Sequence, residues 1–298
     1  MMKFTAKIKC IIVALSLLAG SAAHAQLLWR VSGGGAHRPS YLLGSHHVAP
    51  VNMLDTLSGF DRALGECSEV WGELDCDSMQ VPIVQARVSQ SLIAPPDSSL
   101  TSLLSPEGYA IVERAFARQF GSMGLTLDRF NGVKPVALST MMQALWAVED
   151  FGGQPQAIDD AVQSRARAAG KPVRALETVD FQINLLYNAP LNTQAADLLE
   201  LCRNDSLSRS EMHRVNLAYL AGDLATILDV TVNGCDVSDR ASLDRLLGDR
   251  NRRWAQQLPQ VMRERPVLVC VGAAHLPGPD GLISLLRKAG FTVQPAPR

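Results

Sequence analysis

The sequence lacks the short motifs that identify most common hydrolases and nucleotide-binding proteins. It has no His-Glu-x-x-His, no Gly-x-Ser-x-Gly and no phosphate-binding glycine loop. Ordinary zincin proteases, serine hydrolases and nucleotide-binding enzymes are therefore unsupported as interpretations. A catalytic site in this chain would have to be built from residues that lie far apart in the sequence.

The sequence also lacks an excess of charge of either sign and any linker. Lys and Arg number 28 against 29 Asp and Glu, and no basic stripe is present, so nucleic acid is not an expected partner. A mature chain of this length could form one large α/β domain or two small ones. Because no Gly/Ser-rich, Pro-rich or low-complexity segment divides it, we expect a single α/β domain over residues 26–298.

The first 25 residues have the pattern of a secretory signal peptide. Lys3, Lys7 and Lys9 give a basic start, residues 11–18 form an apolar run, and residues 23–25 (Ala-His-Ala) form a small-x-small cleavage site. The run is too short to span a bilayer, and no second apolar segment approaches that length. We therefore expect a periplasmic or secreted protein with no stable membrane span after cleavage.

Cysteine usage leaves the disulfide pattern open. Export permits disulfides, and the odd number of cysteines after the cleavage site leaves at least one thiol free. Cys67 with Cys76 and Cys202 with Cys235 are candidate pairs, whereas Cys270 lies in an apolar strand and is expected to be a buried free thiol. No tight Cys-x-x-Cys spacing indicates a zinc or redox site.

The apolar patterns predict strands separated by helices. Strands are expected at residues 27–31, 41–44, 69–74, 172–176, 266–271 and 291–294. The helices expected between them include residues 54–67, 159–169 and 242–262. The fold class is therefore α/β, with a mixed central sheet flanked by many helices and a closing strand–helix–strand unit.

Two apolar strands each run into the same Gly-x-x-His pattern. Gly44 precedes His47 by three residues, and Gly272 precedes His275 by three residues. A glycine at a strand end allows a sharp turn and the close approach of a ligand. A histidine three residues further on then lies at the sheet edge, where α/β proteins tend to place their sites. His46 adjoins His47 and is expected to be a neighbouring, supporting residue.

Two carboxylates also follow apolar strands, Glu73 after the third and Glu177 after the fourth. A sheet that gathers these strand ends would place Glu73, Glu177, His47 and His275 in one cleft. Two imidazoles and one carboxylate suit a catalytic divalent ion, and the other carboxylate could act as a general base. Equally, both glutamates could be caps or charge partners. Asp75 and Asp77 are weaker candidates for the ligand role.

A charged run, Asp249-Arg250-Asn251-Arg252-Arg253, lies within the long helix expected over residues 242–262. Such a run is most simply a solvated helix face. Arg250 could instead bind a carboxylate or an oxyanion if its side chain turned inward.

Taken in order, these pieces resemble the TraB/GumN family, which includes the Tiki-type proteins. The matching segments are LLWRVSGGG with SYLLGSHHVAP, VWGELD, GKPVRALETVDFQ, AYLAGDL, GDRNRRW and VGAAHLPGPDGLISLLRKAGFTV. The resemblance covers nearly the whole mature chain. It implies a fold similar to Tiki proteins and erythromycin esterases, and a protease that depends on a divalent ion such as manganese or cobalt. Many members have Gly-Thr-x-His at the first motif, where this chain has Ser45.

The resemblance also suggests roles for individual residues. It makes His47 and His275 the paired motif histidines and Glu73 the acidic residue after the second family strand. Glu177 and Gln182 match one family segment, and Arg250 and Asn251 match its Arg-Asn pair.

The first functional hypothesis is therefore an exported, metal-dependent hydrolase of peptide bonds. His47, Glu73 and His275 would hold manganese, cobalt or zinc, Glu177 would act as base, and Arg250 would stabilise negative charge. The supporting residues would be Gly44, His46, Gln182, Asn251 and Gly272. Two alternatives remain open: an envelope protein that binds a peptide or polysaccharide component without catalysis, and a metal-independent, esterase-like hydrolase.

Overall fold

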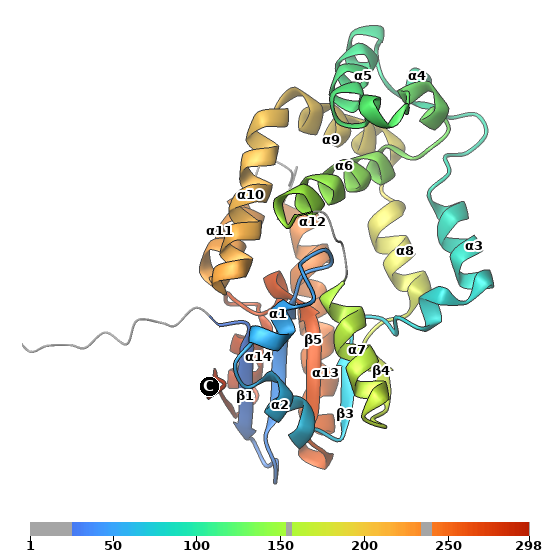
Figure 1. Ribbon diagram of the computed structural model, residues 1–298. Helices are drawn as coiled ribbons and strands as arrows, with labels where there is room; N and C mark the ends of the chain where they lie inside the picture. Colours follow the sequence, from blue (N-terminus) through green and yellow to red (C-terminus); the bar gives the residue numbers. More distant parts are fainter. Residues whose placement is uncertain (1–25, 153–156, 234–239, 298) are drawn as a thin grey trace, which may run out of the picture.

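The computed structural model describes residues 26–152, 157–233 and 240–297. The predicted signal peptide and Cys235 lie outside the described residues. Six strands form one sheet in the order β4–β3–β5–β2–β1–β6 (Figure 1). The strands are β1 (Leu28–Gly33), β2 (Ser40–Ser45), β3 (Glu69–Gly72), β4 (Val173–Ala175), β5 (Val267–Gly272) and β6 (Phe291–Pro295).

The sheet is mixed, as the sequence predicts. Strands β4, β3, β5 and β2 run parallel to one another, and β1 runs antiparallel to both β2 and β6. Every residue of β2 is buried, and β5 is buried over Val267–Val271, as expected for strands covered by helices on both faces. Since parallel strands end at the same edge, the segments after β2, β3, β4 and β5 meet there.

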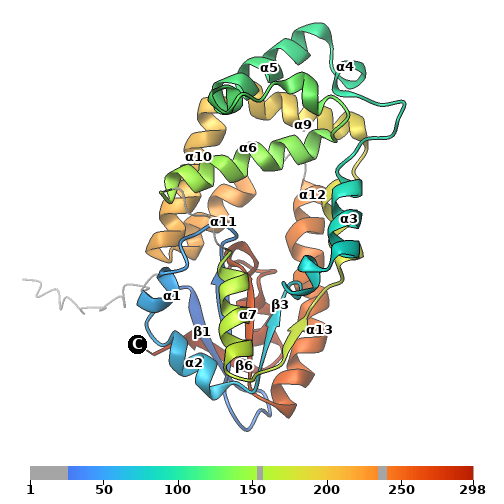
Figure 2. The same cartoon turned by 45° about the vertical axis from the view of Figure 1, so that its right-hand side comes forward.

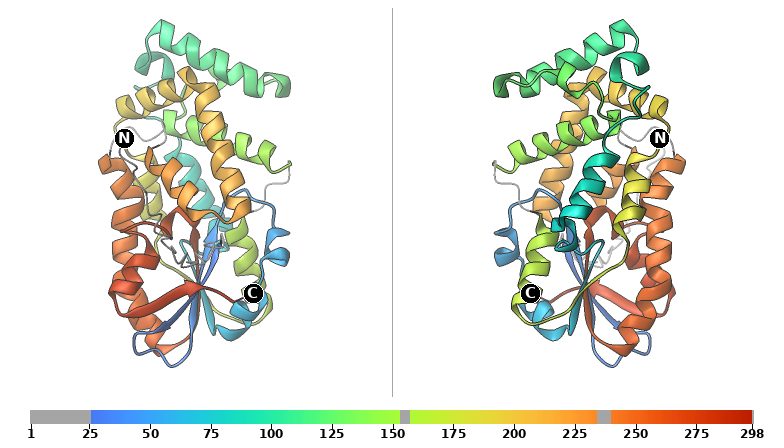
Figure 3. Two further views of the ribbon diagram at one scale, coloured as in Figure 1. Left: turned by 90° about the vertical axis from the view of Figure 1, so that its left-hand side faces the viewer. Right: turned by 90° about the vertical axis from the view of Figure 1, so that its right-hand side faces the viewer.

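Helices cover both faces of this sheet (Figure 3). One face carries α2 (Phe60–Glu66) and α7 (Ile158–Ala168), and the other carries α13 (Asp249–Glu264) and α14 (Leu282–Lys288). The two long helices each bury a stripe at i, i+4 and i+8: Ile158, Val162 and Ala166 on α7, and Trp254, Leu258 and Met262 on α13. Both stripes join the hydrophobic core around the sheet.

A second hydrophobic core lies in a helical region beyond the carboxyl edge of the sheet (Figure 1). It is built by α4 (Leu100–Leu103), α5 (Pro106–Phe120), α6 (Pro135–Asp150) and α9 (Leu191–Arg203). Helices α10 (Asp205–Ala221) and α11 (Leu224–Asn233) lead back to the sheet, where Tyr219 is buried. The strand ends therefore face a helical cover.

Two further helices, α3 (Pro82–Ser91) and α8 (Val179–Tyr187), run side by side between these two regions (Figure 1). Figure 2 shows α3 at the outer side of the molecule, between the helical region and the sheet. Neither helix has a single buried residue. The remaining elements are α1 (Met53–Thr56), α12 (Arg240–Leu243), a π-helical turn (Asp244–Gly248) and the 3₁₀ turns Ser78–Gln80, Gly121–Met123, Leu127–Phe130 and Ala273–His275.

Two predicted helices differ from those observed. The helix expected over residues 54–67 is interrupted after Thr56, where Leu57 is extended, and Gly59, whose φ of +86° suits glycine, precedes the start of α2. A Cβ at Gly59 would also lie 2.7 Å from the Pro297 carbonyl oxygen. The helix expected over residues 242–262 extends to Glu264 and contains the π-helical turn.

The predicted Cys67–Cys76 disulfide is wrong. Cys67, Cys76, Cys202 and Cys270 are free thiols, and Cys270 is fully buried, as expected. Cys67 precedes β3 and Cys76 follows it, so the strand, roughly 10 Å long between Glu69 and Gly72, lies between the two cysteines. The pairing of Cys202 with Cys235 involves a residue outside the described ranges.

Among the residues that the structure describes, no helix combines the length and the apolar character needed to cross a membrane.

Candidate functional site

The loops after β3 and β4 hold two buried carboxylates side by side. The backbone N–H of Glu177 donates to the carbonyl of Glu73 at 3.0 Å, which continues the strand pairing beyond the sheet. Their side chains are 12% and 4% exposed. Two carboxylates this close and this buried require a positive partner.

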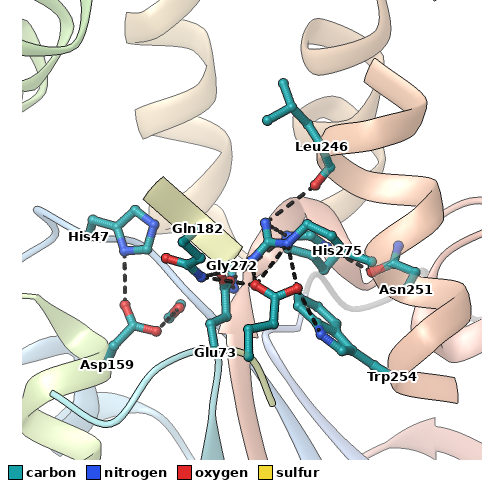
Figure 4. A network of polar contacts seen from close by, with 12 residues as sticks. His47, Glu73, Asp159, Gln182, Leu246, Asn251, Trp254, Gly272 and His275 are labelled. Atoms are coloured by element: carbon teal, nitrogen blue, oxygen red, sulfur yellow. Dashed lines mark hydrogen bonds and ion pairs between the residues drawn. The ribbon is translucent and has the colours of Figure 1, made fainter. Parts of the chain in front are cut away.

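Arg250 of α13 is that partner, and its side chain is 8% exposed. Figure 4 shows the polar network around it, with Glu73, Trp254 and His275 labelled. The Arg250 Nε and Nη2 donate to Glu177 at 3.0 and 2.8 Å, and Nη2 also donates to Glu73. Its Nη1 lies 3.0 Å from Nε2 of His275 and 3.3 Å from the carbonyl of Leu246 in the π-helical turn. Arginine suits this position because its planar fork donates in several directions at once.

Three further groups satisfy the carboxylate oxygens. The Gly272 N–H donates to Glu73 at 2.8 Å, and the Trp254 indole N–H donates to Glu177 at 3.1 Å. The Gln182 amide donates to Glu177 at 3.1 Å and to Glu73 at 3.3 Å. The Trp254 ring also lies 4.8 Å from the Arg250 guanidinium and 4.6 Å from the His275 ring. The buried carboxylate groups of Glu73 and Glu177 therefore have hydrogen-bond donors from the protein.

His275 is the neutral member of this network. Its Nδ1 lies 2.7 Å from the Asn251 amide oxygen, and the Asn251 amide nitrogen donates to the carbonyl of Asp280, which fixes the amide orientation. Nδ1 therefore carries the proton, and Nε2 accepts from Arg250. Burial, with the nearby Arg250 charge, lowers the pKa of His275 to about 4, although Glu73 opposes this.

His47 is the exposed counterpart, with 74% of its side chain accessible. Its Nδ1 lies 3.1 Å from one oxygen of the buried Asp159, whose other oxygen accepts from the Ser45 hydroxyl at 2.6 Å. The hydrogen bond and charge of Asp159 raise the pKa of His47 to about 9. Because Nδ1 faces Asp159, Nε2 is the ring nitrogen left for a ligand.

Glu73 is ionised in this setting. Its burial alone would raise the pKa, but its interactions with His275, Arg250 and His47 and the Gly272 N–H outweigh burial and lower the pKa to about 2. The carboxylate is thus a fixed negative charge at neutral pH.

Gly44 and His46 lie behind the site. A Cβ on Gly44 would come within 3.1 to 3.2 Å of Ala273 and Leu276, so glycine is needed here for close packing between strand ends. Neither Gly44 nor Gly272 has a positive φ, so the sharp turn expected from these glycines is not what they provide. The His46 ring packs against Phe151 and Tyr219 at 5.2 and 5.1 Å.

A pocket of about 230 Å³ lies between the His47–Asp159 pair and the network around Arg250, which are the two halves of the site. His47 and Asp159 line one side, and Glu73, Gln182 and Arg250 line the other. A larger cavity, of about 800 Å³, lies between α11, α12 and α13 and includes none of these five residues. The smaller pocket is therefore the one that joins groups able to transfer protons with a group able to hold negative charge.

Most of the predicted site residues thus meet. One network contains Glu73, Glu177, Gln182, Arg250, Asn251, Gly272 and His275, and His47 faces it across the pocket. Glu177 lies behind Arg250 and does not line the pocket. Asp75 and Asp77 pair with Arg167, away from the site.

The interpretation of residues 249–253 as a solvated face is wrong for two of them. Arg250 and Asn251 are buried, whereas Arg252 and Arg253 have side chains 40% and 48% exposed. The burial follows from α13, which turns the face of Trp254 and Leu258 toward the sheet core, and Arg250 lies one turn before Trp254 on that face.

Asp159 and Trp254 were not anticipated as site residues. Asp159 lies in the first turn of α7, where an acidic residue is ordinarily explained by the helix dipole. For Trp254 the sequence did contain a clue: it stands four residues after Arg250, so the two side chains share one face of a helix.

The histidine nitrogens and the carboxylate of the site are atoms of the kind that bind a divalent ion, but they are not positioned to bind one together. Each motif histidine has Nδ1 bound by an oxygen, from Asp159 or Asn251, which is the arrangement that presents Nε2 to a metal. Yet in the described part of the chain no three His, Cys, Asp or Glu side chains gather closely enough to hold a metal. Arg250 contacts Glu73 and His275 where an ion would have to approach.

Comparison with known proteins gives the family and two distant relatives. The model of the TraB/PrgY/gumN family matches residues 27–295. Metalloprotease TIKI1 of Danio rerio is 23% identical over 87% of this chain and 61% of its own length. Metalloprotease TIKI2 of Danio rerio is 22% identical over 91% of this chain and 61% of its own length. The chain thus spans about three fifths of these relatives. No solved structure matches.

Proposed function

The chain belongs to the TraB/PrgY/gumN family, and from this premise we propose that it is an exported hydrolase of peptide-like bonds. The single observation that carries the proposal is the pocket between His47 and Arg250. It places an exposed imidazole, oriented by a buried carboxylate, opposite a buried guanidinium. The names of the two relatives support a proteolytic reaction on a peptide or protein substrate.

His47 is the proton-transfer group of this proposal. Asp159 holds Nδ1, as the carboxylate does in other catalytic His–Asp pairs, so Nε2 exchanges the proton. With a pKa of about 9 the ring is cationic at neutral pH. It therefore donates a proton to the leaving group once a substrate is bound.

Arg250 is the electrostatic group. Glu177 accepts hydrogen bonds from its guanidinium and the Trp254 ring lies 4.8 Å from it, so the guanidinium is fixed before the substrate arrives. All five of its N–H groups already donate within the network, so it would stabilise a developing oxyanion through its fixed charge rather than through a hydrogen bond. In this arrangement Glu177 positions Arg250, and the ionised Glu73, which lines the pocket, would accept the proton of the attacking water.

We also propose that His47, Glu73 and His275 are the residues that would hold manganese, cobalt or zinc. The two ring orientations and the relatives' names support this ligand set. Such an ion would lower the pKa of bound water and polarise a carbonyl group. Its binding requires Arg250 to release Glu73 and His275.

The position of Arg250 favours a second candidate, hydrolysis without a metal. The guanidinium already lies against Glu73 and His275, so it can supply the positive charge that an ion would bring. His47 and Arg250 would then act as described, and the activity would survive chelators.

The test uses purified protein beginning at residue 26 and a mixture of internally quenched peptides, with and without chelator. Wild type should cleave, and His47→Ala should lose at least about 100-fold in kcat/KM. His213→Ala is the matched control, because His213 is also an exposed histidine 3.2 Å from an aspartate, Asp150, but lies outside the pocket.

Metal binding is measured separately from cleavage. Calorimetry with manganese, cobalt and zinc should give binding that His47→Ala and His275→Ala both weaken if the three-residue ligand set is correct. Activity that persists in chelator together with no binding supports the metal-free candidate. Absence of cleavage under every condition would leave a binding protein for a peptide or polysaccharide component.

A further inference from the structure

The catalytic pocket has an apolar half that the proposed chemistry does not use. Beside its polar groups it is lined by Leu74, Met79, Leu185 and Leu186. Leu74 directly follows Glu73, Met79 lies in the 3₁₀ turn Ser78–Gln80, and the two other leucines lie on α8. Leu186 is 40% exposed, so part of its side chain is open to a ligand.

The sequence of α8 joins this apolar half to the polar network. Gln182 donates to Glu73 and Glu177, and Leu185 and Leu186 follow it at i+3 and i+4. Residues with these spacings share a helix face, and the rise of the helix places them about 4.5 to 6 Å further along the axis. The leucines therefore begin one turn beyond the contacts of Gln182 with the carboxylates.

These leucines are not part of the packing that forms either hydrophobic core of the described chain. Neither α3 nor α8 contributes a residue to the two hydrophobic cores of the described chain, and neither has a buried residue. Helices in a folded protein usually bury an apolar stripe against a neighbour. Here the stripe of α8 faces the pocket in which His47 and Arg250 lie.

The size of the pocket, in which the apolar residues adjoin the polar network, indicates what kind of ligand it could bind. A pocket of about 230 Å³ is smaller than the roughly 300 to 1,000 Å³ typical of sites that enclose a whole ligand. It suits the part of a longer chain around one bond and one side chain. The apolar half offers that side chain no charged or amide partner.

We propose that Leu74, Met79, Leu185 and Leu186 form a subsite for a large apolar side chain adjoining the bond that is hydrolysed. This inference rests on the proposed function for its position beside the scissile bond. It assigns the substrate class as peptides with Leu, Phe or Met at that position, and it makes Leu185 and Leu186 specificity-determining residues.

The experiment measures binding and cleavage separately. Two fluorescent peptide pools are compared that differ at one central position, which is Leu, Phe or Met in one pool and Ser, Asn or Gln in the other. Binding is measured on His47→Ala, which keeps the apolar half and lacks the proton-transfer group. The apolar pool should bind about tenfold more tightly, since a filled hydrophobic pocket discriminates by roughly 10- to 200-fold.

The paired change Leu185→Ser with Leu186→Ser, in the same background, should remove most of this preference. Leu207→Ser is the matched control, because Leu207 is 52% exposed on α10 and does not line the pocket. It should leave the preference unchanged. Circular dichroism checks that each variant is folded.

Two outcomes overturn the inference: equal binding of both pools, or a preference that the paired leucine variant retains. Binding preference without cleavage by wild type would uphold the apolar subsite and overturn the hydrolase. Cleavage of both pools at equal kcat/KM would uphold the hydrolase and overturn the subsite.

Discussion

The two Gly-x-x-His strand ends have the same local sequence pattern and opposite environments. They follow neighbouring parallel strands, with Ser45 opposite Gly272 in the register. Yet His275 is 4% exposed and has a pKa of about 4, whereas the His47 side chain is 74% exposed and has a pKa of about 9. The motif thus fixes where each histidine lies, and the packed neighbours decide its protonation.

The difference arises from what packs over each strand end. After β5, a 3₁₀ turn carries His275 under α13, where Trp254, Asn251 and Arg250 enclose the ring. After β2, His46 takes the place against aromatic rings, and His47 turns toward the solvent with Asp159 as its partner. One half of the site is therefore a rigid, closed network, and the other is open to a substrate.

The largest expected effect comes from opening the closed half. Arg250→Leu would leave Glu73 buried without its cation and Glu177 with only the 3.5 Å contact to Arg253, and breaking a buried pair in this way costs about 3 to 5 kcal/mol. Urea denaturation at pH 7 measures the loss in the free energy of unfolding. Arg250→Lys should lose less, because it keeps the charge but not the planar fork.

Arg252→Leu is the control for this prediction. Arg252 lies two residues away and also pairs with carboxylates, Asp244 and Asp249, but at the surface. Its replacement should leave stability nearly unchanged. Equal losses for the two arginine variants would contradict the closed network that distinguishes His275 from His47.

The second effect is the dependence of stability on acid. His275 has a pKa of about 4 in the folded protein, against about 6.5 when unfolded, so below pH 6.5 the unfolded chain binds a proton that the fold excludes. The contribution is zero above pH 6.5 and grows to a loss of about 2 to 3 kcal/mol as the pH falls to 4.

His275→Gln isolates this contribution, because glutamine keeps polar groups but does not titrate. The variant should lose less stability than wild type between pH 6.5 and 5, measured by urea denaturation at several pH values. His46, whose pKa burial also lowers to about 4, is present in both proteins and cancels in the difference. Identical pH profiles would mean that His275 titrates normally.

The sequence predicted the parts of this site that depend on strand ends. Glu73 and Glu177 follow apolar strands, and parallel pairing necessarily brings such ends to one edge. The antiparallel pairing of β1 with β2 was predictable for a different reason: the two strands are short apolar runs joined by a glycine-rich turn. Arg250 was only an option, because a charged helix run does not reveal which side chain faces inward.

Other features depend on contacts between distant residues. Asp159 stands 112 residues from His47 and meets it only because α7 packs on β3, β4 and β5 of the sheet. The Cys67–Cys76 pairing failed because sequence proximity ignored the strand between them. The exclusion of α3 and α8 from both hydrophobic cores is likewise a property of the packing rather than of any local pattern.

The smallest effect tests the open half through Asp159→Asn. Without the carboxylate, the pKa of His47 should fall from about 9 toward its ordinary value near 6.5, as measured by NMR titration of the imidazole signals. The raised pKa stabilises the fold fully below pH 6.5 and progressively less as the pH rises through 9, so the variant should lose this dependence. The stability change at pH 7 should stay below about 1 kcal/mol, because His47 is mostly exposed and solvent screens the pair.

Asp150→Asn, which alters the corresponding partner of His213, is the control and should leave the His47 titration unchanged. A His47 pKa that stays near 9 in Asp159→Asn would mean that Glu73, across the pocket, sets it instead, and the two halves of the site would then be one electrostatic unit.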